Sequence, residues 1–306
     1  MTQVLQFTGL FLLAFTLVGA GMPGMAMALF PLPVAVYWAR GLQRQSGILL
    51  VCAGLSVLLA TGSAVLAVMF MVVAGTGVLA GEMAVRQWSF GQAVALLTAV
   101  VFGFLAVSQL ANWAAVREEG IVFVLARLEG NPAAGEVGPW MEAHYDDMFF
   151  GTLFGSVLAG MTLFVAFFRR WLELKQVPAG LRGSFAAMRP PEWLVWAVIA
   201  VALLWFAEQR WSHDLLRAVT WNSAIALAVL YALNGFALVL YALQGLQASP
   251  LLAYASVFGL LVLLPNTLPM LAFTGLFDTW WNLRQKVDRL ASARRAENEK
   301  NGTGAP

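Results

Sequence analysis

Residues 48–81 read ILLVCAGLSVLLATGSAVLAVMFMVVAGTGVLAG, an apolar run without a single Asp, Glu, Lys, Arg or His. A helix needs about 20 apolar residues to cross a bilayer, at about 1.5 Å of rise per residue. This run is too long for one crossing, and small and polar residues interrupt it at Thr61, Gly62 and Ser63. We therefore predict two short helices that bend at these three residues.

The rest of the chain has the same apolar character. Of its 306 residues, 60% are hydrophobic and 11% are charged, whereas a soluble domain carries about 25% charged residues. The apolar runs do not alternate with polar residues, as the strands of a membrane barrel would. The composition predicts an all-α integral membrane protein, with the lipid bilayer as its main partner. The chain has no basic stripe with interleaved aromatic residues, so nucleic acid is not expected as a partner.

We predict a polytopic transmembrane helical bundle of about eight or nine spans, some of them short or broken by Pro or Gly. Besides the two spans in 48–81, the candidates are residues 4–22, 24–38, 91–110, 149–168, 193–206, 219–243 and 251–277. The bundle would occupy residues 1–283, and residues 284–306 would form a charged cytoplasmic tail with a disordered end.

The distribution of Lys and Arg predicts the orientation, because short loops rich in these residues stay in the cytoplasm. Arg40, Arg86 and the basic loop 169–191 are all cytoplasmic if the amino terminus is, and the acidic segment 112–147 then lies outside. We therefore expect a bacterial inner-membrane protein.

The basic tail disagrees with this orientation. Its Lys and Arg residues predict a cytoplasmic position, but three crossings after residue 191 would place the tail outside. Pro265 and Pro269 interrupt the last apolar run. Two half-helices that enter the membrane and return there would restore the parity, and a merely kinked helix is the alternative.

Glycines near the start form Gly19-x-Gly21-x-x-Gly24, which on paper is a dinucleotide-binding fingerprint. That motif needs a preceding strand and an acidic residue about 20 positions later, but residues 4–38 contain no acid. Small residues spaced by four instead let two helices approach closely. The helix-packing candidates with this spacing are Ala20, Gly24 and Ala28, Gly77 and Gly81, and Gly151 and Gly155.

Polar side chains within spans usually face the bundle interior or a cavity. The deepest are Asn222, Asn234, Gln244 and Asn266, and we interpret each as a helix contact or a ligand contact. A further cluster, which would lie at an outer mouth or in a solvated turn, contains Glu208, Arg210, His213, Asp214 and Arg217.

Few residues could form a disulfide, bind a metal or take part in catalysis. The single cysteine, Cys52, excludes an internal disulfide, and His144 and His213 have no His or Cys at metal-ligand spacing. No serine stands in a nucleophile elbow and no paired carboxylates project from one span. We therefore predict no enzyme, no metal site and no cofactor.

Charges near helix ends form the last set of candidates. Glu82 and Arg86 are four apart, acid first, which is the favourable pairing on a helix. Asp278 and Arg284 mark where the last span leaves the membrane. We predict that Asp278 pairs with a cation from another helix, Arg40 or Arg86, and so ties the bundle together at its cytoplasmic face.

Four stretches carry a family resemblance. They are RPPEWLVW at 189–196, GLFDTWWNLR at 275–284, PLP at 31–33 followed by Arg40, and YALQG at 241–245. They resemble the YybS-like family of predicted bacterial membrane proteins, a domain of unknown function, over most of the chain. The resemblance implies a layout similar to that of the substrate-binding subunits of energy-coupling-factor vitamin transporters and of the rod-shape protein MreD.

Two functions follow as hypotheses. The first is a solute-binding or transport-associated membrane subunit that binds a small molecule and works with a separate energising partner. The alternative is a non-transporting scaffold for envelope assembly or division, with 112–147 and the tail as docking surfaces. Either role implies contact with other membrane proteins or with further copies of this chain.

Overall fold

A computed structural model describes residues 31–62, 64–128, 134–178, 180–211, 213–247 and 264–302, together with residues 249, 251–252, 255–256 and 259. These residues are helical apart from their connections and one isolated bridge between Ser89 and Arg182. The predicted all-α class is confirmed. The predicted span 4–22 and residues 24–30 of the predicted span 24–38 lie outside the described residues, as do Ala20, Gly24 and Ala28.

The first half of the bundle is built around the long helix α8. Its elements are α3 (Leu32–Ala39), α4 (Gln43–Thr61), α5 (Ala64–Val85), α6 (Phe90–Ala111) and α8 (Ala134–Leu174). The predicted bend in residues 48–81 is confirmed, because α4 ends at Thr61 and Gly62 adopts the left-handed conformation with φ 66°. Glycine tolerates this conformation without the steric cost of a Cβ.

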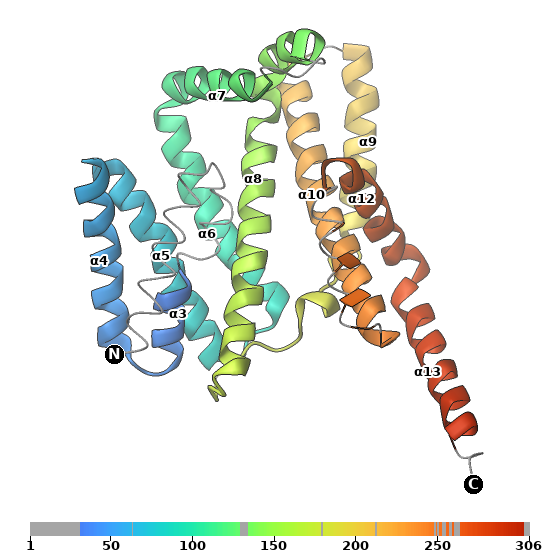
Figure 1. The fold of residues 1–306 in the computed structure, drawn as a ribbon. Helices are drawn as coiled ribbons and strands as arrows, with labels where there is room; N and C mark the ends of the chain where they lie inside the picture. The colour runs from blue at the N-terminus through green and yellow to red at the C-terminus, as the bar shows by residue number, and fades with distance from the viewer. Residues whose placement is uncertain are drawn as a thin grey trace.

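The second half packs on the other side of α8 (Figure 1). Its elements are η1 (Phe185–Ala187), α9 (Leu194–Trp211), α10 (Asp214–Gly245), α12 (Leu264–Trp281) and α13 (Leu283–Gly302). Helix α7 (Trp113–Leu128) lies across one end of the bundle, which we call the α7 end. Helix α13 extends beyond the opposite end, which we call the α13 end. It ends at Gly302 and so includes the first two of the last six residues, 301–306, for which disorder is predicted.

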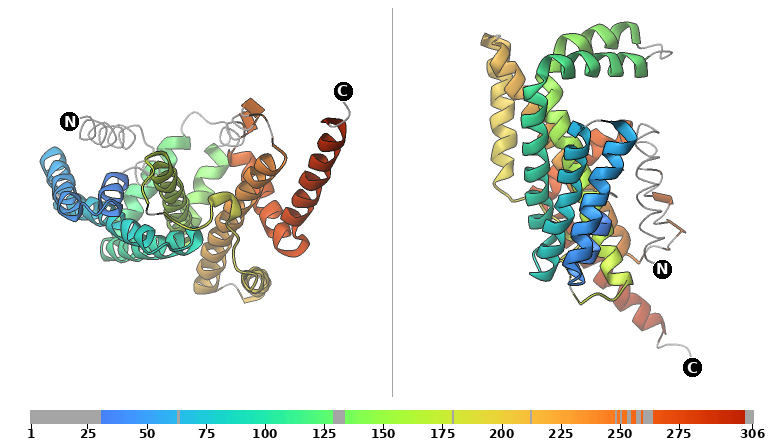
Figure 2. Two further views of the ribbon diagram at one scale, coloured as in Figure 1. Left: turned by 90° about the horizontal axis from the view of Figure 1, so that it is seen from below. Right: turned by 90° about the vertical axis from the view of Figure 1, so that its left-hand side faces the viewer.

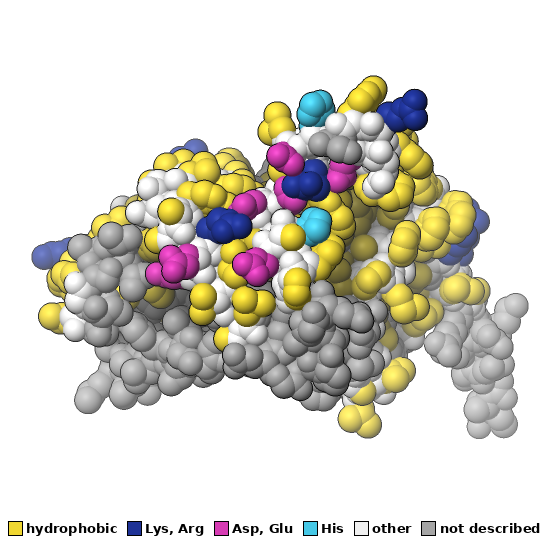
Figure 3. Space-filling view, turned by 90° about the horizontal axis from the view of Figure 1, so that it is seen from above, with side chains coloured by type: hydrophobic (Ala, Val, Ile, Leu, Met, Phe, Trp, Pro, Cys, Tyr) yellow, Lys and Arg dark blue, Asp and Glu magenta, His cyan; other side chains and the backbone are white. Residues whose placement is uncertain are grey.

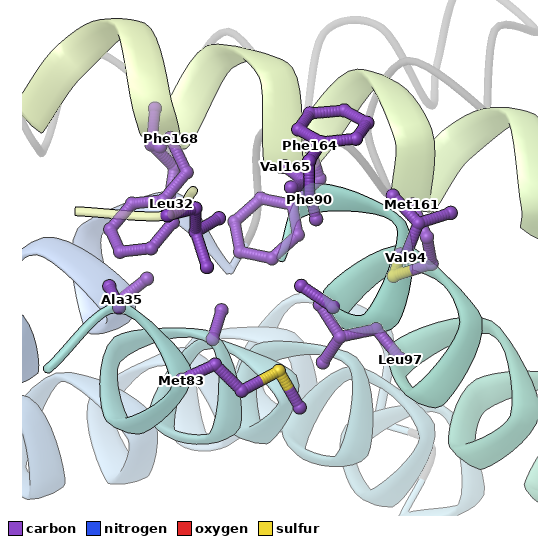
Figure 4. Packing of buried hydrophobic residues seen from close by; sticks show 14 of the residues in the cluster. Leu32, Ala35, Met83, Phe90, Val94, Leu97, Met161, Phe164, Val165 and Phe168 are labelled. Atoms are coloured by element: carbon purple, nitrogen blue, oxygen red, sulfur yellow. The ribbon is translucent and has the colours of Figure 1, made fainter. Parts of the chain in front are cut away.

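The main hydrophobic core lies where α8 meets α3, α5 and α6 (Figure 4). Phe164 and Phe168 of α8 are fully buried and stack with ring centroids 6.0 Å apart. The same cluster contains Leu32 and Ala35 of α3, Met83 of α5, and Phe90, Val94 and Leu97 of α6. In a bilayer, close van der Waals packing of these side chains therefore holds this half together.

Five described helices are long and apolar enough to cross a membrane. They are Ala67–Val85, Phe90–Ala111, Gly138–Leu174, Leu194–Trp211 and Asp214–Gly245. This is fewer than the predicted eight or nine spans. Helix α3 has only eight residues, and α12 contains two prolines, three Thr, an Asn and an Asp, so neither qualifies as a span within the described part of the chain.

Helices α10 and α12 run in the same direction, from the α7 end toward the α13 end (Figure 1). The tail therefore leaves at the end where the α5–α6 and α8–α9 connections lie, and these carry Arg86 and the basic loop. The two half-helices predicted for residues 251–277 stay a prediction, because residues 260–263, just before α12, lie outside the described residues. Pro265 and Pro269 both lie inside the continuous helix α12, and Pro265 is in its first turn, where a proline removes no helical hydrogen bond.

Helix α9 stands at the side of the bundle (Figure 2). It packs mainly on α10, and Val195 is its only buried residue. Apolar side chains of α9 point outward, with Trp196 70% exposed and Phe206 65% exposed. In a soluble protein such a helix would be unstable, whereas a bilayer accommodates it.

Candidate functional site

Two helices cross closely at a pair of glycines, Gly235 on α10 and Gly275 on α12. A Cβ on Gly275 would collide with the Tyr231 carbonyl oxygen, and a Cβ on Gly235 would collide with the Leu271 carbonyl oxygen. Small residues at a helix crossing let two backbones approach. This approach places the polar side chains of both helices within hydrogen-bonding distance of each other.

Asn234 uses both ends of its amide at this crossing. Its Nδ2 donates to the Gly275 carbonyl oxygen at 2.8 Å, and its Oδ1 accepts from Arg284 Nη2 at 3.1 Å. The side chain is buried, so these two bonds offset its desolvation. Of the two interpretations of Asn234, the structure shows the helix contact.

Asp278 and Arg284 form a buried ion pair. Arg284 Nε lies 3.5 Å from Asp278 Oδ2, and both side chains are 2% exposed. The Arg284 backbone N–H also donates to Asp278 Oδ1 at 3.3 Å, so the carboxylate satisfies one free N–H at the start of α13. Asn282, with φ 46°, separates α12 from α13 and turns Arg284 back toward Asp278.

The predicted partners of Asp278 were wrong. The cation beside it is Arg284, from the adjoining helix, rather than Arg40 or Arg86. Arg86 instead pairs with Glu82 at 2.7 Å, which confirms the predicted spacing of that exposed pair. Glu82 also accepts from Trp38 Nε1 at 3.1 Å and so links α5 to α3.

Arg284 is the largest fully buried side chain among the described residues. Its guanidinium carbon lies 5.6 Å from the centre of the Tyr241 ring. Nε and Nη1 have no hydrogen-bond partner in the described part of the chain. Burial lowers the pKa of the guanidinium, the Asp278 carboxylate opposes this shift, and the nearby Arg189 adds to it. The cation is therefore only partly compensated.

An apolar groove of about 520 Å³ lies between α9, α10 and α12. Its walls include Val198, Val201 and Trp205 of α9, Trp221, Ala224, Ala228 and Tyr231 of α10, and Leu268, Ala272 and Leu276 of α12. A volume of this size is typical of small-molecule sites. Tyr231 is 3% exposed, and its hydroxyl has no hydrogen-bond partner within the described residues.

A second polar contact joins α8 to α10 nearer the α7 end. Asn222 Nδ2 donates to the Ala218 carbonyl oxygen at 2.8 Å, and Asn222 Oδ1 accepts from the backbone N–H of Gly151. A Cβ on Gly151 would lie 2.5 Å from the Asn222 carbonyl oxygen. A Cβ on Gly155 would lie 2.8 Å from Cγ2 of the Val229 side chain. The predicted helix-packing role of Gly151 and Gly155 agrees with these contacts.

Side chains of both charges lie at the α7 end, which Figure 3 views. Arg217 pairs with the buried Asp147 of α8 at 2.6 Å and with Asp214 at 3.1 Å. Arg117 of α7 pairs with Asp146 at 2.9 Å. The acidic segment 112–147 thus contains α7 and the first turns of α8, and two of its acids, Asp146 and Asp147, connect helices. Within the described residues, no three His, Cys, Asp or Glu side chains lie together as a metal site would require.

The remaining predicted residues lie apart from the groove. Gly77 and Gly81 let α5 approach α3, where a Cβ on Gly81 would lie 2.7 Å from Trp38 Cβ. Gln244 is exposed at the end of α10. The side chain of Asn266 lies outside the described residues.

Sequence reasoning missed three features of the site: Gly235, the hydroxyl of Tyr231 and the nearness of Arg189 to Arg284. Gly235 immediately follows Asn234 in a span, and this adjacency was an available signal. The other two depend on how the helices cross, which no local pattern reveals.

The fold and the apolar helices define an all-α integral membrane protein. Residues 149–279 match the family described as "Predicted membrane protein (DUF2232)". This stretch runs from the middle of α8 to the end of α12 and contains the groove, and the match agrees with the resemblance to YybS-like membrane proteins. No curated protein and no solved structure matches the chain.

Proposed function

We propose that this chain is a non-enzymatic inner-membrane subunit that binds a hydrophobic small molecule and works with a separate partner. The single observation that carries the proposal is the groove of about 520 Å³ between α9, α10 and α12. Apolar side chains line it, and the loosely packed helix α9 forms one wall. A ligand dissolved in the bilayer would reach it from the side.

The charge distribution supports a cytoplasmic α13 end in this proposal. The basic connections and the tail lie at the α13 end, and the acidic segment lies at the α7 end. Loops rich in Lys and Arg stay in the cytoplasm. The groove would then open within the bilayer, with the Asp278–Arg284 pair at its cytoplasmic end.

A groove-filling variant tests the proposal. Ala228 lines the groove and Ala200 is an exposed residue of α9 that does not line it. Ala228→Trp should abolish co-purification of a bound small molecule in native mass spectrometry, whereas the matched control Ala200→Trp should retain it. Equal occupancy in the wild type and both variants would refute binding in this groove, as would a wild-type protein that carries no ligand.

The α7 end favours the scaffold as a second candidate function. Glu118 and Glu119 are exposed on α7, which lies across the bundle as a platform. A partner with a basic surface would dock there. Crosslinking in cells, followed by capture of envelope proteins, should lose those proteins in the Glu118→Lys/Glu119→Lys variant. Capture that this variant leaves unchanged would count against the scaffold.

A further inference from the structure

The apolar groove ends next to a polar recess. On α10, Tyr231 lines the groove and Asn234, three residues later, lines the recess. On α12, Leu276 lines the groove and Thr279 lines the recess. Residues three apart on a helix are neighbours on one face, so the recess continues the groove toward the α13 end.

The recess has unused hydrogen-bond donors beside it. Asn234 and Asp278, which both line it, also contact the buried guanidinium of Arg284. Arg284 Nε and Nη1 have no hydrogen-bond partner among the described residues, and neither has the Tyr231 hydroxyl. Buried donors without acceptors are rare and costly. An empty binding site contains such donors until a ligand with an acceptor atom binds.

The charges around the recess nearly balance without a ligand. Arg189 and Glu192 line it from the segment before α9, and Asp278 lies opposite Arg284. Asp278 already accepts from the Arg284 backbone, and at 3.5 Å its contact with Nε is an ion pair without a hydrogen bond. One guanidinium and one carboxylate are therefore buried beside the recess, and the exposed Arg189 and Glu192 carry one charge of each sign at its rim. The recess has about 30 Å³ of free space, which suits an oxygen atom of a ligand.

We infer that the ligand is a single-chain amphipath whose hydrocarbon chain lies in the groove and whose oxyanion head accepts hydrogen bonds at the recess from Arg284, with Arg189 adding a second positive charge. This inference rests on the proposed function and names the class of its ligand. Tyr231 lies between the two regions and donates to an oxygen at the base of the head. Charge-assisted bonds to the head give the ligand one orientation in the groove.

Three probes separate the parts of this inference, with the full-length protein in phosphatidylcholine nanodiscs. Dodecanoate carries both chain and head, dodecanol carries the chain without the charge, and acetate carries the head without the chain. We expect dodecanoate to bind about tenfold more tightly than dodecanol, because a hydrogen bond to a charged group contributes at least that factor. Acetate should not bind measurably at the same concentrations.

Variants locate the head. Arg189 is exposed, so Arg189→Gln should fold normally and remove part of the preference for dodecanoate, and Arg189→Lys should restore it. Glu192→Gln removes a carboxylate from the same rim and should strengthen dodecanoate binding. Tyr231→Phe deletes only the hydroxyl and should weaken dodecanoate more than dodecanol.

The outcomes test the oxyanion head separately from the hydrophobic groove. Equal affinity for dodecanoate and dodecanol would overturn the oxyanion head and leave the hydrophobic groove in place. Acetate binding as tight as dodecanoate binding would overturn the amphipath. Failure of both chain-bearing probes would overturn the proposed function together with this inference. A preference for dodecanoate that Arg189→Gln and Tyr231→Phe both leave unchanged would show that the head binds elsewhere.

Discussion

Replacing Asp278 by Asn should destabilise the bundle far more than breaking an exposed ion pair. Asp278 and Arg284 lie 3.5 Å apart and both are 2% exposed. At an effective dielectric constant of about 20, the Coulomb attraction at this distance is about 5 kcal/mol. Removing one partner of a buried pair leaves the other charge uncompensated, which costs about 3–5 kcal/mol. We expect a loss of that size in the free energy of unfolding.

The measurement is equilibrium unfolding in mixed micelles, followed by tryptophan fluorescence. Asp146→Asn is the matched control, since its pair with Arg117 leaves the two side chains 52% and 44% exposed. Exposed pairs contribute about 0–1 kcal/mol. Adding Arg284→Met to Asp278→Asn should recover at least half of the loss, because it removes the unpaired charge. A loss in Asp278→Asn within about 1 kcal/mol of the Asp146→Asn control would refute the reasoning.

Four further predictions concern the helix contacts and the topology. Gly275→Val should prevent the close crossing of α10 and α12 and so sharply lower the unfolding temperature. The control Gly103→Ala should not, because Gly103 is a helical glycine with open space around it. Similar losses of stability in both variants would contradict the crossing. Gly62→Ala should cost about 1 kcal/mol in unfolding experiments, because Gly62 has φ 66°, and no cost would argue against the left-handed turn. Asn222→Ala should cost about 1–3 kcal/mol, because it removes the acceptor for the Gly151 N–H, whereas a neutral result would mean that this bond adds no stability. Reporter fusions after residue 302 and in the loop at residue 183 should give the same cytoplasmic signal, and opposite signals would refute the parallel course of α10 and α12.

Apolar runs predicted the helices well, and their ends poorly. The run 149–168 predicted one span, yet α8 continues from Ala134 to Leu174. The early turns contain Asp146 and Asp147, which ended the apolar pattern. Their carboxylates pair with Arg117 and Arg217 of other helices, and the helix therefore continues past the apolar segment. Hydropathy cannot detect such pairing, because the partners are distant in sequence.

Residues of the site could be predicted from the sequence, but the residues that they contact could not. Asn234 and Asp278 stood out because polar groups are costly within a span. Asp278 was assigned to the wrong arginines because the turn at Asn282 depends on a positive φ that the sequence does not announce. The groove was not foreseen, since Ala, Leu and Trp in a span are equally suited to lipid. These residues line a groove only because α9 and α12 are separated from each other.

The contact between α8 and α10 has a consequence for biosynthesis. The face of α8 that carries Gly151 is covered by Asn222, 71 residues later, and α9 is made in between. At about 5–20 residues per second, the ribosome needs roughly 4–14 seconds to add that stretch. During this interval the newly inserted α8 has its glycine face open to any neighbouring helix. This face is therefore shielded by no described part of its own chain until the carboxyl-terminal half has been made.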